Sequence, residues 1–142
     1  MKIYSAICNA IRIAILHVTM SVICSYAETG APVKYISSCD IDLNNDGASD
    51  IALLIETIRG RELIVLIKTS NGYEPFLMSD IDNMNLSCHF GKTITETKAG
   101  IGKRSGKIHN TQGTYIKLTL PEGSSLVYFW NGVGFEKVWT SD

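Results

Sequence analysis

The chain has little of several features that mark whole classes of protein. It holds only 3 prolines among 142 residues, which excludes a proline-rich spacer, and only 19% of its residues are charged. It has no Cys-x-x-Cys pair, so zinc-ribbon and thioredoxin-like chemistry lack their usual ligands. Because 45% of the residues are hydrophobic, the composition is that of a folded domain rather than of a disordered segment.

The amino end has the pattern of an export signal. A basic start precedes a mostly apolar run at residues 13–24, and small residues at positions 25 and 27 fit a cleavage site. We therefore expect residues 1–27 to be a signal peptide and residues 28–142 to form one β domain, periplasmic or secreted from a bacterial cell. The apolar run is shorter than the ~20 residues of a membrane span, which disfavours a retained anchor. A lipid-modified Cys24 is the other alternative, disfavoured because a bulky isoleucine precedes it.

The mature chain would carry a small negative charge. The 13 lysines and arginines fall to 11 when Lys2 and Arg12 are removed, against 14 acidic residues. This balance does not favour a nucleic-acid binder held by bulk charge. Residues 98–107 read KAGIGKRSGK, whose glycine spacing is not that of a phosphate-binding loop. Within this segment Lys103 and Arg104 are candidates for contact with an acidic ligand, and a mobile, solvated loop is the alternative.

Cleavage would leave two of the four cysteines, Cys39 and Cys88. An even pair in an oxidising compartment predicts a disulfide. It would close a loop of about 50 residues and contribute about 4 kcal/mol in the chain-entropy account. Two buried free thiols are the alternative.

The rest of the chain has the pattern of short strands separated by turn residues. It predicts an all-β protein, a small antiparallel β-sandwich or open barrel, too short for a full propeller. No sustained helical periodicity occurs after the signal. Residues 79–112 are the least regular stretch. The expected strands cover residues 33–37, 51–58, 62–69, 73–78, 114–120, 125–130 and 135–139.

Two neighbouring runs, IALLIETI and ELIVLIKT, are nearly continuous in apolar residues and are joined by a tight turn at Arg59-Gly60. Such strands lie centrally in a sheet or are covered on both faces. The pattern leaves open which alternate set faces the core, because both sets are apolar. The core candidates are Leu53, Ile55, Leu63, Val65 and Ile67.

The strongest local signal is an acidic loop before the first of these runs. Asp42, Asn44, Asp46 and Asp50 occupy positions 1, 3, 5 and 9 of a calcium loop, and the Ala48 carbonyl could serve position 7. The set predicts a structural Ca²⁺. Position 12 lacks the glutamate of an EF-hand, so the loop is of another type. A turn stabilised by side-chain to backbone hydrogen bonds is the alternative.

Residues 42–56, DLNNDGASDIALLIE, resemble a single FG-GAP/VCBS repeat of integrin-like propellers, whose D-x-[ND]-x-D-G-x-x-D loop precedes a strand. The resemblance implies calcium binding at Asp42, Asn44, Asp46 and Asp50. With one copy present, it does not imply a propeller. Residues 121–142 are similar to the closing segment of small exported bacterial proteins that open with such a loop, a group to which no activity is assigned.

No reactive constellation stands out, so we expect a non-catalytic binding protein rather than an enzyme. The expected partner is another exported or envelope protein, with no nucleic acid and no stable membrane span after cleavage. One alternative is a carbohydrate or cell-wall binding module that uses exposed aromatic rings, with Tyr128 and Trp130 on one face of a strand. Cross-strand core packing would explain the same rings. A carboxylate-dependent hydrolase is the remaining alternative.

Overall fold

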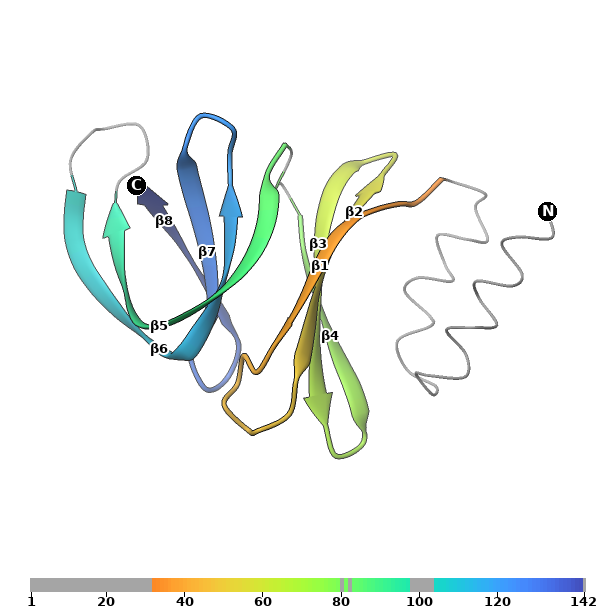
Figure 1. Cartoon of the computed structure of the whole chain (residues 1–142), viewed down its shortest axis with the longest axis horizontal. Coiled ribbons are helices and arrows are strands. Elements are labelled where there is room, and N and C mark those ends of the chain that lie inside the picture. The colour runs from red at the N-terminus through yellow and green to blue at the C-terminus, as the bar shows by residue number, and fades with distance from the viewer. Residues whose placement is uncertain (1–31, 80, 82, 98–103, 142) are drawn as a thin grey trace.

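The computed structural model describes residues 32–79, 81, 83–97 and 104–141, and all regular structure in them is strand (Figure 1). Two four-stranded antiparallel sheets form in the orders β1-β2-β3-β4 and β5-β6-β7-β8. They are not closed into a barrel, which confirms the predicted small all-β fold. The described stretches contain no helix with the length and hydropathy of a membrane span. The strands are β1 (Lys34–Ile41), β2 (Asp50–Thr57), β3 (Gly60–Thr69), β4 (Gly72–Met78), β5 (Asn85–Thr97), β6 (Arg104–Thr119), β7 (Ser124–Trp130) and β8 (Phe135–Ser141).

The main hydrophobic core lies between the two sheets. Alternate residues of each strand point into it, as the two-residue period of a strand requires. The first sheet supplies side chains from β1, β2 and β3, and the second from β6 and β7. The buried members are Ile41, Leu43, Ala52, Leu54, Leu63, Val65, Ile67, Ile81, Met84, Ile116, Leu118, Leu126 and Tyr128.

The register of the central hairpin decides which face of β2 belongs to this core. Leu54 pairs with Leu63, and both face the second sheet. Leu53 pairs with Ile64 and lies on the opposite face. Of the predicted core residues, Leu63, Val65 and Ile67 therefore lie in the main core, whereas Ile55 is buried in a separate cluster on the opposite face, against which Leu53 packs. Alternation alone could not reveal this, because every one of these positions is apolar.

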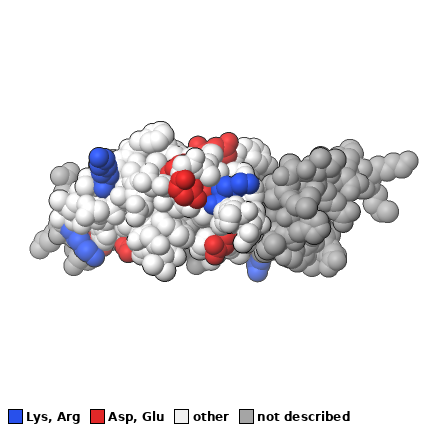
Figure 2. Space-filling view, turned by 90° about the horizontal axis from the view of Figure 1, so that it is seen from below, with Lys and Arg blue, Asp and Glu red and all other residues white. Residues whose placement is uncertain are grey.

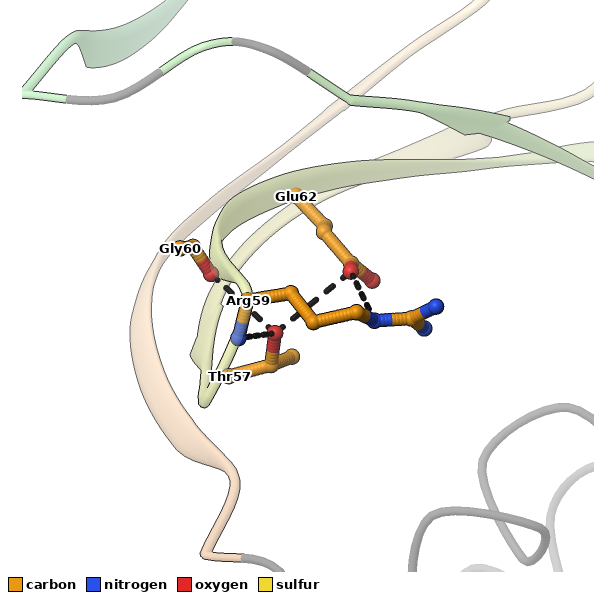
Figure 3. Close-up of polar contacts among 4 residues, drawn as sticks. All are labelled: Thr57, Arg59, Gly60 and Glu62. Carbon is orange, nitrogen blue, oxygen red and sulfur yellow. Dashed lines mark hydrogen bonds and ion pairs between the residues drawn. The ribbon is translucent and has the colours of Figure 1, made fainter.

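The same turn device fixes the register of the first two hairpins. At the β2–β3 turn, the Thr57 hydroxyl lies 3.2 Å from the Gly60 carbonyl and 3.1 Å from the Arg59 amide that donates to it (Figure 3). Thr69 makes the equivalent contacts at the β3–β4 turn. Gly60 and Gly72 both have positive φ, 113° and 125°, which favours glycine at these positions. Thr-x-x-Gly is thus a local sequence signal for both turns.

The predicted irregular stretch, residues 79–112, contains regular structure. Asn85–Thr97 forms β5, and Arg104–Thr119 extends far upstream of the expected strand. Residues 85–90, Asn-Leu-Ser-Cys-His-Phe, alternate polar and apolar residues, which is a strand signal that the prediction missed.

A disulfide joins the two sheets. Cys39 of β1 and Cys88 of β5 are bonded, with a Cα–Cα distance of 6.0 Å and a sequence separation of 49 residues. The predicted pairing is confirmed. Nearby, the Thr114 hydroxyl of β6 donates to the Asp42 carbonyl at 2.5 Å, a second link between the sheets. The disulfide closes the chain from Cys39 to Cys88, which includes the connection between β4 and β5, into a covalent loop.

We expect the double substitution Cys39→Ala and Cys88→Ala to lower the free energy of unfolding by about 4 kcal/mol. The reason is that the bond removes conformational freedom from the unfolded chain. Urea denaturation followed by tryptophan fluorescence measures the loss, and reduced wild-type protein is the matched control. A variant with the midpoint of the oxidised protein would contradict the expectation.

Candidate functional site

The acidic loop connects β1 to β2 at one end of the first sheet. β1 ends at Ile41 and β2 begins at Asp50, and these two residues pair with each other across the strands. The intervening residues therefore form a closed loop whose ends are held by the sheet. Asn45 and Gly47 have positive φ, 60° and 86°, which lets the chain reverse direction within a few residues.

Hydrogen bonds from backbone N–H groups to acidic side chains shape this loop. The Asp42 carboxylate accepts from the Asp46 amide at 3.2 Å and from the Gly47 amide at 2.9 Å. Asn44 Oδ1 also accepts from the Asp46 amide, at 3.1 Å. The Asp46 carboxylate accepts from the Ala48 amide at 2.8 Å and from the Asn44 side-chain amide at 3.0 Å. The oxygens of Asp42, Asn44 and Asp46 are thus drawn together around shared donors.

Asp50 has a different position from the other three. Its side chain is fully buried, and its two oxygens accept from the Leu43 amide at 2.8 Å and from the Lys68 amide at 2.7 Å. The carboxylate therefore fastens the acidic loop to β3. Both contacts are charge-assisted hydrogen bonds inside the protein, where such bonds are strong.

Burial raises the pKa of the Asp50 carboxyl above its ordinary value. The hydrogen bonds from Lys68 and Leu43 lower that pKa, and the charges of Asp46 and Asp42 raise it further. The influence of Asp46 and Asp42 shows that three carboxylates share one electrostatic environment. A cation in the loop would relieve this repulsion.

The donor set suits a hard cation, because every candidate ligand atom is an oxygen. Among the described residues, however, no group of three or more His, Cys, Asp or Glu side chains is arranged to hold a metal ion. The hydrogen bonds from the Asp46, Gly47 and Ala48 amides to acidic and amide side chains are those of the alternative interpretation, a turn built from side-chain to backbone contacts. Calcium binding at Asp42, Asn44, Asp46, Ala48 and Asp50 therefore stays a prediction.

The aromatic rings proposed for sugar binding lie in the core. Tyr128 is only 5% exposed, and Trp130 is half-buried between the sheets. The Trp130 ring packs edge-on against Phe76 and Phe135, with centroids 5.6 and 5.3 Å apart. The predicted face is correct, since Phe129 points the other way, but these rings form no exposed platform. The rings pack in the core because both sheets supply aromatic partners for Trp130.

Most of the basic segment, residues 98–107, lies outside the described residues. Lys103 lies outside the described residues, and the structure describes Arg104 only as the start of β6. Figure 2 shows acidic and basic side chains interspersed among neutral ones on one face of the described domain. On that face neither sign forms a continuous patch.

Two polar side chains of β5, two residues apart, lie in contact. His89 Nε2 lies 2.9 Å from Ser87 Oγ, and the His89 ring stacks on Tyr115 with a centroid distance of 5.4 Å. The pair has the nucleophile–base contact of a hydrolase, but no ion pair among the described residues orients His89. Asp82, the acid nearest in sequence, lies outside the described residues.

A second cluster pairs His109 with two acids. His109 Nε2 lies 2.9 Å from a Glu96 oxygen, and Nδ1 lies 3.8 Å from a Glu136 oxygen. The two carboxylates approach the same imidazole from its two nitrogens. The imidazole ring therefore lies between the two carboxylates.

Comparison with known proteins does not assign this chain to a family. No protein-family model, curated protein or solved structure matches the chain.

We expect Asp50→Asn to lower the free energy of unfolding at pH 7 by about 1–3 kcal/mol. The amide NH₂ of asparagine would face one of the two backbone N–H groups that Asp50 now accepts. Chemical denaturation measures the change. Asp40→Asn is the matched control, because Asp40 is exposed, and we expect it to stay within about 0.5 kcal/mol.

The raised pKa of Asp50 predicts how the difference in stability between the wild type and Asp50→Asn changes with pH. A carboxyl whose pKa is raised by folding binds its proton more tightly in the folded protein. Its contribution to stability is fully present below the unfolded pKa and is lost as the pH rises through the folded pKa. The stability advantage of the wild type over Asp50→Asn should therefore shrink between pH 3 and pH 7. A gap that widens over this range would contradict it.

Proposed function

We propose that this protein is an exported, non-catalytic binding protein whose ligand is another exported or envelope protein. The observation that supports the proposal best is the apolar outer face of the first sheet. We use this name for the face of β1–β4 that points away from the second sheet. The Cys39–Cys88 disulfide is compatible with an oxidising compartment outside the cytoplasm.

The outer face carries an apolar cluster of its own. Ile55 of β2 and Ile64 and Leu66 of β3 form it, with Ile51, Leu53 and Tyr73 packed against them. In Figure 1 the described strands of the second sheet all lie on the side of the first sheet that is opposite to this outer face. A two-sheet sandwich needs only one apolar face per sheet, because the other normally meets water. The second apolar face is therefore not required by the main core.

Exposed apolar side chains border this cluster. Tyr35 pairs with Ile55 and is 62% exposed, and Leu77 pairs with Ile64 and is 51% exposed. Ile58, in the adjacent β2–β3 turn, is also exposed. Ile55, Ile64 and Leu66 are themselves only 4–6% exposed, so Tyr35, Leu77 and Ile58 supply the exposed apolar surface of this face. Exposed apolar surface of this kind marks contact sites for proteins.

Charged and hydroxyl groups close one end of the outer face. Glu62 follows the same alternation as Ile64 and is buried at 5% exposure. Its carboxylate lies 3.5 Å from Arg59 Nε and 3.4 Å from the Thr57 hydroxyl (Figure 3). An apolar centre with a polar rim is the usual arrangement of a protein interface.

In this proposal the acidic loop binds a structural Ca²⁺ through Asp42, Asn44, Asp46 and the Ala48 carbonyl, with Asp50 holding the loop to β3. The resemblance to an FG-GAP/VCBS repeat and the all-oxygen donor set support it. The ion would neutralise carboxylates that otherwise repel one another, and so would stiffen the connection between β1 and β2.

The partner surface is tested by placing a photo-crosslinking amino acid at Leu77. We expect a discrete adduct with one envelope protein, lost when unlabelled protein is added in excess. Val133 is the matched control site, since it is 89% exposed but lies in the β7–β8 turn of the second sheet. The same adducts from both positions, or none from Leu77, would count against the outer face.

The calcium loop is tested by thermal unfolding with Ca²⁺ and then with a chelator. A ligand that binds only the folded state raises the melting temperature, here by several degrees at millimolar Ca²⁺. We expect Asp46→Ala to abolish the rise, whereas Asp40→Asn should retain it. An identical melting temperature in Ca²⁺ and chelator would reduce the loop to a hydrogen-bonded turn.

A further inference from the structure

The outer halves of β5 and β6 form an arm that leaves the plane of the second sheet. We define the arm as residues 93–97 and 104–111. β5 and β6 span 13 and 16 residues, but β7 and β8 span only 7 each. β6 pairs with β7 only from Ile116 to Thr119, so the arm continues beyond the sheet and curves (Figure 1).

A bend at the base of the arm has identifiable causes. The β5–β6 register shifts between Gly91 and Thr93, and Gly113 opposite has a φ of 104°. Gly91 lies directly against Tyr115, where an added Cβ would come within 2.9 Å of the ring. Bulges and glycines of this kind turn a strand pair sharply.

Beyond the bend the arm lies across β7 and β8. Ile94 of the arm is buried with Val127, Phe129 and Val138. The Thr97 hydroxyl donates to the Trp139 carbonyl at 3.4 Å. These contacts are few, and among the described residues no backbone ladder joins the arm to β7 or β8.

His109 provides a second polar contact between the arm and β8. Its side chain is 9% exposed, and its ring lies on Phe129 with centroids 5.7 Å apart. Nε2 lies 2.9 Å from Glu96 within the arm, and Nδ1 lies 3.8 Å from Glu136 on β8. The Asn131 side chain donates to the other Glu136 oxygen at 2.9 Å and so holds that carboxylate in place.

We propose that His109 is a pH-dependent latch that fastens the arm to β8. A protonated imidazole has two N–H donors and a positive charge, and so satisfies both carboxylates at once. A neutral imidazole has one N–H, so one carboxylate then faces a lone pair. Protonation of the ring therefore holds the arm against β8, and loss of the proton loosens it. Opening would bare Val127 and Phe129.

The charged groups around the ring support this assignment. Glu96 comes from β5 and Glu136 from β8, whereas β7 contributes only the uncharged Phe129. Lys107, two residues earlier on β6, is exposed. The Lys137 ammonium lies over the Tyr128 ring, 6.0 Å from its centroid. The two carboxylates are thus the charged groups that contact the imidazole among the described side chains.

Hydrogen exchange of the purified protein at pH 5.5 and pH 8.5, corrected for intrinsic rates, tests the latch. We expect arm amides such as Ile94 and His109 to open about fivefold to tenfold more often at pH 8.5. Amides of the central strands, such as Leu54, should not change. Equal opening of the arm at both pH values would overturn the proposal.

Variants assign the effect to one side chain. His109→Gln should remove the pH response, whereas His89→Gln should retain it, because His89 contacts Ser87 and Tyr115 instead of a carboxylate. Should His109→Gln fail to fold, Glu136→Gln at a 45% exposed side chain should reduce the response. An undiminished response in His109→Gln, or in its place in Glu136→Gln, would overturn the proposal.

Discussion

The need to cover two strands that are apolar on both faces constrains the rest of this structure. β2 and β3 direct Leu54, Leu63 and Val65 toward the second sheet and Ile55 and Ile64 away from it. Burial of apolar surface is the dominant favourable term in folding, so the inward set brings the two sheets together. The outward set gives the first sheet a second apolar face, which the proposed binding function uses.

The links between the sheets are concentrated at one side of this core. The Cys39–Cys88 disulfide, the Thr114 contact to the Asp42 carbonyl and the approach of β1 to β5 all join the strand that precedes the acidic loop to the second sheet. Asp50 then fastens the loop to β3. A change in the loop would therefore reach both sheets, which gives a bound cation a route to global stability.

Local sequence signals predicted much of this arrangement. The strand class, the tight turn at Arg59-Gly60 and the disulfide pairing follow from residue types and spacing. The inward face of β2 did not follow, because both alternate sets are apolar and only the pairing of Leu54 with Leu63 separates them. β5 was overlooked because its second half, residues 93–97, contains only one apolar residue, Ile94. Tyr128 and Trp130 were placed on the correct face, but their burial depends on Phe76 from the other sheet.

The amino-acid sequence by itself determined the all-β class, the turns, the cysteine pair and the acidic loop, because each depends on residues close together or on a count. The tertiary structure alone decided which groups meet across the fold. Glu96 and Glu136 reach His109 only because the β5–β6 arm bends over β8. Asp50 turns inward to Lys68 because strand pairing brings two distant backbone amides to one carboxylate. Such contacts depend on how distant strands come together and on the curvature of the strands, which the local patterns of this chain do not encode.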